Sequence, residues 1–203
     1  MEVVVANNLP RAGTRGAVPL KLADFVGSVK RLAWAKDNGC PWEAKTCTQI
    51  ARGGQLEVLQ WARENGCPWS VDTCCRAAEN GHLKVLRWAR EHHCPWDGRT
   101  CARAAEGGHL DVLKWAREHH CPCGVATCAS AAGGGHLEML QYLREHDCPL
   151  DDATCFLAAN SGHLEVLRWA RQHDCPWNKV ACVGVADARG HVELAQWVRA
   201  QGP

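Results

Sequence analysis

The sequence predicts an all-α protein in which helix-turn-helix repeats stack into an elongated solenoid of about seven repeats. A Cys-Pro-Trp tripeptide or a close variant recurs six times, always 27 residues after the previous copy. A second Cys follows each copy after seven residues, and Trp or Tyr recurs with the same period. The segments between these markers lack the alternation typical of β-strands, and the period is too short for a propeller blade. The tripeptides begin at Cys40, Cys67, Cys94, Cys121, Cys148 and Cys175.

The first half of each repeat predicts a helix of about two turns. In the copy formed by residues 100–122, Thr100 is a residue type favoured at helix N-caps, and the following Ala-rich stretch favours helix. The paired glycines Gly107 and Gly108 then end the helix.

The second half predicts a longer amphipathic helix. Leu110, Val112, Leu113, Trp115 and Ala116 form one apolar stripe, and the charged residues of this stretch fall on the other side. A proline two residues after the helix end prevents its continuation. The residues at the helix ends are types that tolerate a left-handed conformation, namely Gly39, Gly66, His93, His120, Asp147 and Asp174.

Neither helix can bury its apolar stripe alone, so the periodic Cys and Trp residues are expected to form the core between stacked repeats. Equivalent residues of stacked helices should lie about 8 to 10 Å apart, which is too far for a disulfide. A bridge within one turn, such as Cys94 to Cys101, stays open at this stage. Free Cys otherwise behaves as a small buried hydrophobe.

Composition is typical of a soluble folded protein, with 46% hydrophobic and 22% charged residues among 203. The formal net charge of +1 lacks the basic excess expected of a nucleic-acid-binding protein. No signal peptide is evident, and no stretch approaches the ~20 apolar residues of a membrane span. The protein is therefore expected to be intracellular and cytoplasmic, with a nuclear location left open.

The segment AAENGHLKVL at residues 77–86, with copies at 104–113 and 158–167, resembles the ankyrin repeat pattern T-P-L-H-x-A-A-x-x-G-H-L-x-V-V. The resemblance covers residues 19–201, in which residues 20–23 and 29–34 stand for the two helices of a weaker first repeat. Residues 19–203 are accordingly expected to form an ankyrin-like repeat domain. Residues 1–18 lack helical periodicity and are expected to be disordered or a loose cap.

Two departures from the family pattern are evident. Cys replaces the Pro after Thr, and the period is 27 residues where the ankyrin period is 33. The missing residues fall mainly in the connector that carries a β-hairpin in ankyrins, so these projections should be stubs. Ankyrin arrays bind proteins and have no intrinsic activity. The resemblance therefore implies a monomeric, non-enzymatic adaptor that needs no cofactor and binds another protein of unknown identity.

Cys and His residues also suggest an alternative function, a metal- or redox-responsive protein. The strongest candidate ligands are His119, His120, Cys121, Cys123 and Cys128, which are zinc ligand types within reach of one turn. However, Cys123 is the substitution of a periodic Trp in one repeat only. The His residues of the Gly-His-Leu motif are expected to stabilise turns by hydrogen bonds. No metal site is therefore predicted.

The partner-binding face is predicted by comparing the repeats with one another. Core positions barely change between copies, whereas the turn and the first helix vary freely. In an ankyrin-like stack these positions should line one concave strip, polar at one end and apolar at the other. The alternative explanation is that these positions vary because they lie on the surface, where packing does not constrain them. The polar residues are Lys45, Arg52, Asp72, Arg76, Glu79, Arg99, Arg103 and Glu106, and the apolar ones include Val125, Phe156 and Leu157.

Within this strip, Arg76 and Arg103 are expected to contribute most, because interface hot spots are enriched in Arg. The Arg-Glu pairs of the second helices, such as Arg90-Glu91 and Arg117-Glu118, are instead expected on a solvated outer face.

Overall fold

The computed structural model describes residues 26–202 and contains thirteen α-helices and no strand within that range. The predicted helical-repeat solenoid is therefore confirmed. The segment 1–18 and the expected helix at residues 20–23 lie outside the described residues. The connectors carry no β-hairpin in the described part of the chain, as the short period predicts.

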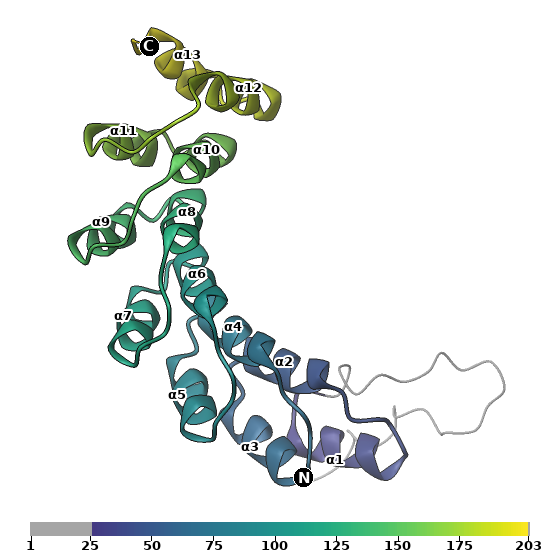
Figure 1. Ribbon diagram of the computed structural model, residues 1–203. Helices are drawn as coiled ribbons and strands as arrows, with labels where there is room; N and C mark the ends of the chain where they lie inside the picture. The colour runs from purple at the N-terminus through teal and green to yellow at the C-terminus, as the bar shows by residue number, and fades with distance from the viewer. Residues whose placement is uncertain (1–25, 203) are drawn as a thin grey trace, which may run out of the picture.

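The helices form two parallel rows (Figure 1). The first helices of the repeats are α2 (Ala44–Arg52), α4 (Val71–Glu79), α6 (Gly98–Glu106), α8 (Val125–Gly133), α10 (Asp152–Ser161) and α12 (Lys179–Arg189). The second helices are α1 (Val29–Asp37), α3 (Leu56–Glu64), α5 (Leu83–Glu91), α7 (Leu110–Glu118), α9 (Leu137–Glu145), α11 (Leu164–Gln172) and α13 (Val192–Ala200). The solenoid is curved, and the first helices follow the inner side of the curve.

The curvature follows from side-chain size. Neighbouring first helices pack closely along the whole row, whereas neighbouring second helices contact one another far less. The buried face of a first helix is made of small side chains, as in Cys101, Ala104 and Ala105. Second helices bury larger ones, as in Val112 and Leu113, and carry a Trp beside them. Helix axes come closer across small side chains, so the array closes on the inner side.

The first helices begin three residues earlier than the sequence predicted. Asp97, not Thr100, is the N-cap of α6, and its side chain accepts a hydrogen bond from the Arg99 amide. Thr100 is fully buried within the first turn. In α4 the Thr73 hydroxyl accepts a hydrogen bond from the Ser70 amide at 3.4 Å, so this Thr takes the role that Glu has in a capping box. The polar residue before the helix is therefore the cap, and the periodic Thr supports it from inside.

The predicted left-handed residues after the second helices are confirmed. Each of the six has a positive φ, between 57° at Asp174 and 81° at Gly66. The amide of the Cys that follows hydrogen-bonds back to the helix, as from Cys94 to the Ala89 carbonyl at 2.8 Å. This turn directs the chain into the Cys-Pro-Trp loop at the same angle in every repeat.

In four repeats a histidine forms a hydrogen bond to the repeat before it. The ring Nε2 of His136 donates to the carbonyl oxygen of Glu106, 30 residues earlier, at 3.0 Å. The ring also covers Gly108, whose φ is +76°. The equivalent bonds of His82, His163 and His191 measure 3.0 to 3.1 Å. The expected turn hydrogen bond thus joins two repeats and does not stay within one.

The contact between His136 and Gly108 can be tested by comparing two Gly→Ala substitutions. Gly108→Ala should lower the free energy of unfolding by about 2 to 3 kcal/mol, because it combines left-handed strain with a crowded contact. A Cβ there would lie 2.5 Å from His136 Cε1. Gly190→Ala is the control, since its φ is +78° but nothing lies within 4 Å of the added Cβ, so only about 1 kcal/mol should be lost. Chemical denaturation measures both, and equal losses would show that the histidine contact is unimportant.

The core runs through the whole array between the two rows. Cys is a core residue, as expected, and twelve of the fourteen cysteines are buried. The Trp prediction needs correction, because Trp88, Trp115 and Trp169 are half-buried at the edge of the core. Gaps between the separated second helices leave one side of each indole open. The periodic Trp residues therefore seal the core and also form part of the outer surface.

Candidate functional site

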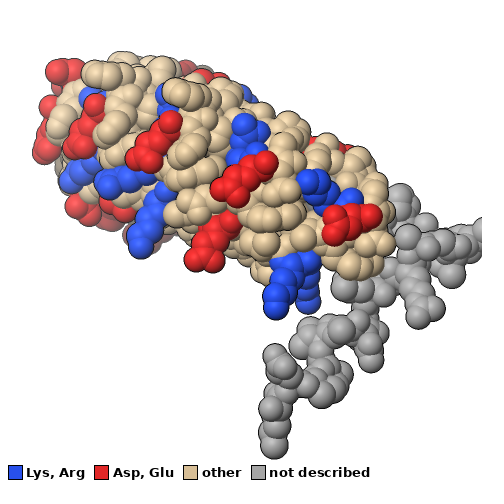
Figure 2. Space-filling view, turned by 90° about the horizontal axis from the view of Figure 1, so that it is seen from below, with Lys and Arg blue, Asp and Glu red and all other residues tan. Residues whose placement is uncertain are grey.

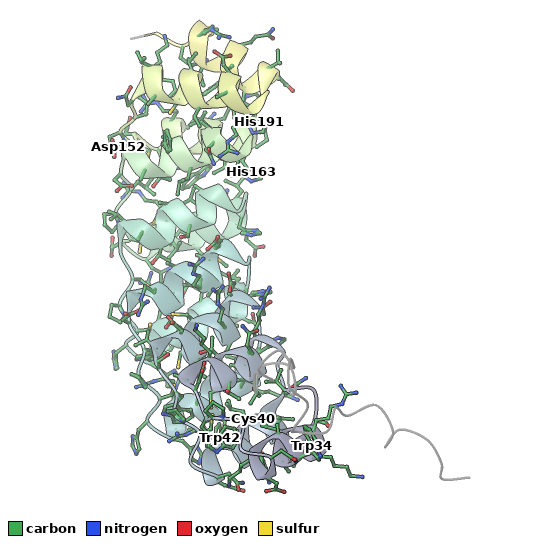
Figure 3. The ribbon with its side chains drawn as sticks, turned by 90° about the vertical axis from the view of Figure 1, so that its right-hand side faces the viewer. Trp34, Cys40, Trp42, Asp152, His163 and His191 are labelled. Atoms are coloured by element: carbon green, nitrogen blue, oxygen red, sulfur yellow. The ribbon has the colours of Figure 1, made fainter. Side chains whose placement is uncertain are left out.

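The inner surface of the solenoid is formed by the row of first helices. Figure 3 looks onto this row, with His163 and His191 along one edge and the helix start at Asp152 along the other. All eleven residues of the predicted strip lie on these helices. Lys45 and Arg52 belong to α2, Asp72, Arg76 and Glu79 to α4, Arg99, Arg103 and Glu106 to α6, Val125 to α8, and Phe156 and Leu157 to α10.

The charged residues of α4 and α6 form one network across two repeats. Arg76 Nη1 lies 2.5 Å from Glu79, and Arg103 Nη1 lies 2.7 Å from Glu106. Glu79 also lies 3.7 Å from Arg103 and so links the two helices. Arg76 and Arg103 therefore stand one repeat apart with both guanidinium groups held in place. Their side chains remain about 41 to 42% exposed and accessible to a partner.

A second ion pair crosses the row near the helix starts. Arg99 Nη1 lies 3.3 Å from Asp72 of the preceding repeat, and Arg99 Nε lies 3.0 Å from the N-cap Asp97. Exposed pairs of this kind contribute at most about 1 kcal/mol each to folding. Their main effect is to fix the positions of the charges along the inner surface.

Beyond α6 the inner surface becomes apolar. Val125 is 40% exposed and Phe156 is 39% exposed, and both are large hydrophobic side chains. Leu157 is half-buried and lies against Gly133 of the preceding repeat, where an added Cβ would be 3.4 Å from the Leu157 Cβ. The structure adds Val180 on α12, which is 82% exposed and which the sequence analysis missed. Val180 occupies the same repeat position as Asp72 and Arg99, so extending that comparison to the last repeat would have found it.

The rest of the surface has mixed charge. Along the face in Figure 2, Lys and Arg side chains alternate with Asp and Glu side chains and form no large region of one sign. This agrees with the formal net charge of +1. A field that would attract a polyanion to the whole surface is absent from this face.

The arginines of the second helices are not simply solvated, which corrects the prediction for the outer face. Arg90 is half-buried, donates to the carbonyl oxygen of Cys94 and stacks over Trp96 with its Cζ 4.3 Å from the ring centroid. Arg63 and Arg171 repeat this arrangement over Trp69 and Trp177. Guanidinium is planar and carries several donors, so it can satisfy a loop carbonyl and an indole face together. These arginines therefore fix the Cys-Pro-Trp loops, whereas Glu91 and Glu118 are exposed.

The buried cysteines form pairs that sequence spacing did not reveal. Cys47 Sγ lies 3.2 Å from Cys67 Sγ, twenty residues later, and both thiols are free. Each pair joins a first helix to the loop that begins the next repeat. The open question of a Cys94–Cys101 bridge is answered, since both are free thiols. In the later repeats the loop thiol and burial together raise the pKa of the first-helix thiol, in the pairs Cys74–Cys94, Cys101–Cys121, Cys128–Cys148 and Cys155–Cys175.

The two thiols of the Cys128–Cys148 pair differ in acidity. The hydrogen bond from Cys128 and the charge of Arg117 together lower the pKa of Cys148 to about 7, despite burial. The same hydrogen bond, together with burial, raises the pKa of Cys128. In this pair the loop thiol, Cys148, is therefore the one that more readily becomes a thiolate.

The zinc candidates have other partners. Within residues 26–202, no three His, Cys, Asp or Glu side chains are arranged so that they could hold a metal ion. His119 Nδ1 bonds to the Trp115 carbonyl oxygen at 2.8 Å, and the Cys121 thiol donates to the Asp97 carbonyl oxygen at 3.3 Å. His120 has a φ of 62° at the helix end. Geometry therefore gives no support to a zinc site at these residues.

The burial of the cysteines makes a prediction for thiol titration. In native protein only Cys40 and Cys123, the two half-buried thiols, should react promptly with a thiol reagent. After denaturation without reductant all fourteen cysteines should react. Finding fewer reactive thiols in the denatured protein would contradict the free-thiol assignment.

Comparison with known proteins shows the fold. No protein-family model and no curated protein matches the chain. Many solved structures match, among them the crystal structure of the human ASB11 ankyrin repeat domain. That match has a TM-score of 0.59 and 14% sequence identity, and it covers 77% of this chain and 83% of that chain. The chain thus has an ankyrin-like repeat fold, as its Gly-His-Leu motifs predicted. No helix among the described residues is long and apolar enough to cross a membrane.

Proposed function

We propose that this protein is a monomeric, non-enzymatic binding module whose partner protein docks along the inner row of first helices. The observation that carries the proposal is the composition of that row. Ion-paired arginines and carboxylates on α4 and α6 continue into exposed apolar side chains on α8, α10 and α12. A protein interface combines apolar contact area with a polar rim in this way.

Exposed large hydrophobic side chains gather at the apolar end of the row. Four large hydrophobic residues are exposed in the described part of the chain, and Val125, Phe156 and Val180 all belong to first helices. Exposed apolar groups that gather on one surface are typical of interaction sites. The fold supports the same function, since ankyrin-like solenoids present a long concave surface. Its free thiols favour a reducing compartment, so we place the protein inside the cell.

Affinity capture from the native source tests the proposal. The bait is the full chain, and the matched baits are Arg76→Glu with Arg103→Glu on the inner row and Lys84→Glu with Lys114→Glu on the second helices. Both double variants change the net charge by the same amount. A specific partner should be recovered with the wild type and the second-helix variant and lost with the inner-row variant. Recovery of one partner by all three baits would refute the inner-row site.

The thiol pairs favour a second candidate function, a response to oxidation. Two thiols whose sulfurs lie 3.2 Å apart, as in Cys47 and Cys67, are placed to form a disulfide when an oxidant such as diamide accepts their two protons and two electrons. Treatment with diamide followed by peptide mapping would test it. A Cys47–Cys67 bridge formed in folded protein supports this function, and oxidation confined to Cys40 and Cys123 contradicts it.

A further inference from the structure

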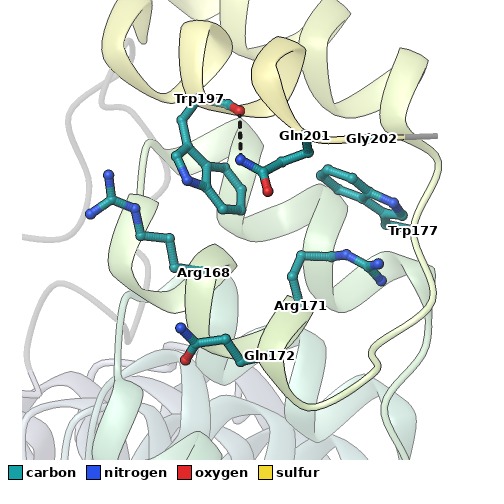
Figure 4. Close-up of a pocket in the computed structure, with 7 residues that line it drawn as sticks. All are labelled: Arg168, Arg171, Gln172, Trp177, Trp197, Gln201 and Gly202. Carbon is teal, nitrogen blue, oxygen red and sulfur yellow. Dashed lines mark hydrogen bonds between the residues drawn. The ribbon is translucent and has the colours of Figure 1, made fainter.

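A second type of site recurs on the outer side of the solenoid. Three cavities of about 340, 470 and 460 Å³ each lie between two consecutive second helices and the Cys-Pro-Trp loop that joins their repeats. The first two occupy adjacent repeats, and the third is at the step from α11 to α13. The middle cavity is lined by Arg87, Arg90, Glu91, Trp96, Trp115 and His119. Figure 4 shows the third, which is lined by Arg168 beside Trp197 and by Arg171 beside Trp177.

Two indole rings form the apolar walls of every cavity. The ring centroids of Trp96 and Trp115 are 5.8 Å apart with an interplanar angle of 60°. The corresponding pairs are Trp69 with Trp88 at 5.9 Å and Trp177 with Trp197 at 6.4 Å. All of these rings are half-buried, so each offers an open edge or face to a ligand.

The fold does not require these Trp pairs. At the next two steps of the array, Cys123 and Leu150 replace the loop Trp, yet α7, α9 and α11 keep the same length and the same capping geometry. Stacking of second helices therefore proceeds without a paired indole. The two adjacent cavities form at steps of the array where both Trp residues are present. Packing of the second helices therefore does not explain why these Trp pairs are present.

The charge around the middle cavity favours an anionic ligand. Arg87 and Arg90 face one carboxylate there, that of Glu91, whereas the first cavity is lined by one arginine and one carboxylate, Arg63 and Glu64, and Arg168 of the third cavity is paired with Glu165. Arg90 is fixed by its bond to the Cys94 carbonyl and by Trp96. Arg87 is exposed, makes no ion pair within the described residues, and lies over Trp115 with its Cζ 5.7 Å from the ring centroid. Arg87 is thus a positioned cation beside an apolar pocket.

We propose that the two adjacent cavities bind an extended acidic segment of a partner protein. One apolar side chain of the segment enters each Trp pair, and neighbouring carboxylates pair with Arg87 and Arg90. Stacked helices lie about 8 to 10 Å apart, and an extended chain advances about 3.3 Å per residue, so about every third residue meets a cavity. A peptide is favoured over a nucleic acid because the chain has a formal net charge of only +1.

This site lies on the opposite row of helices from the one in the proposed function, so the two can be tested separately. A phage library of random peptides about twelve residues long, roughly 40 Å when extended, is selected on the immobilised full chain. Enriched peptides are then synthesised with a fluorescent label, and their affinity is measured by anisotropy. Two variants test the site, Arg87→Glu and Trp96→Leu. The second places at Trp96 the residue that the protein itself has at Leu150, so the fold should tolerate it.

The expected result is a set of acidic peptides with an apolar residue at about every third position. Arg87→Glu should weaken their binding about tenfold or more and Trp96→Leu about fivefold, because each removes a central contact. The control, Arg76→Glu with Arg103→Glu, should leave this affinity within about twofold.

Three outcomes would overturn the proposal. First, selection on the wild-type protein could enrich peptides no more than selection on the Arg87→Glu, Trp96→Leu double variant does. The enriched peptides could bind Arg87→Glu as tightly as the wild type. Finally, a single-stranded oligothymidine could displace them at lower concentration than the unlabelled peptide, which would assign the cavities to nucleic acid.

Discussion

Replacing Leu113 by Ala should lower the free energy of unfolding by about 3 to 5 kcal/mol. Leu113 lies on α7 in the middle of the array and is fully buried in the core shared by the two rows of helices. Its removal takes away apolar contacts and leaves a cavity that rigid neighbouring helices fill only in part. Urea denaturation followed by helical circular dichroism measures the change.

Val125→Ala is the matched control. Val125 is 40% exposed at the start of α8, so its truncation should change the free energy of unfolding by less than about 1 kcal/mol. The contrast between the two variants tests whether the interior of the array, and not its inner surface, determines stability. A loss at Val125 as large as that at Leu113 would contradict this division.

The double substitution Arg76→Glu with Arg103→Glu should weaken binding of the inner-row partner by more than ~2 kcal/mol, or about thirtyfold. Both arginines are exposed, and Glu79 holds them in one network. Their reversal would gather five carboxylates on α4 and α6 and repel any acidic group of the partner. Titration calorimetry with the captured partner gives the affinity.

The control for this experiment is Lys84→Glu with Lys114→Glu on the outer row, which causes the same change in net charge. It should leave the affinity within about threefold, because exposed charges distant from an interface act only weakly through solvent. Melting temperatures of both variants should stay close to that of the wild type, since exposed ion pairs contribute little to folding. A larger loss of affinity from the outer-row variant would assign the partner to the second helices.

Much of the fold could be predicted from sequence because its determinants are local. The 27-residue period, the apolar stripe around Leu113 and the left-handed residues such as His93 and Asp147 all act within one repeat. Stacking then follows, since each repeat has an apolar side that only a neighbour can cover.

The details that the sequence analysis missed depend on contacts between repeats. Cys47 meets Cys67 only because a first helix packs against the following loop, and no spacing rule indicates a pair twenty residues apart. Arg90 looked solvated because its helical position is polar, but the loop brings Trp96 beneath it. Thr100 was assigned as a cap because Thr is a favoured capping residue, whereas Asp97, three residues earlier, performs that role.

The sequence predicted which residues form the candidate site, but not the contacts that these residues make with one another. Comparing the repeats identified the variable residues of the first helices. The bridge from Glu79 to Arg103 depends on how closely α4 and α6 approach, which side-chain size at the core determines. Val180 was missed because the last repeat was interpreted only as a cap, although its first helix continues the inner row.

Hydrogen exchange of the protein with and without its partner tests the inner-row proposal most directly. The account predicts slower amide exchange in the first helices from α4 to α12 and in the loops that precede them when the partner is bound, with α5, α7 and α9 unchanged. Slower exchange confined to α5, α7 and α9, with the first helices unaffected, would contradict it.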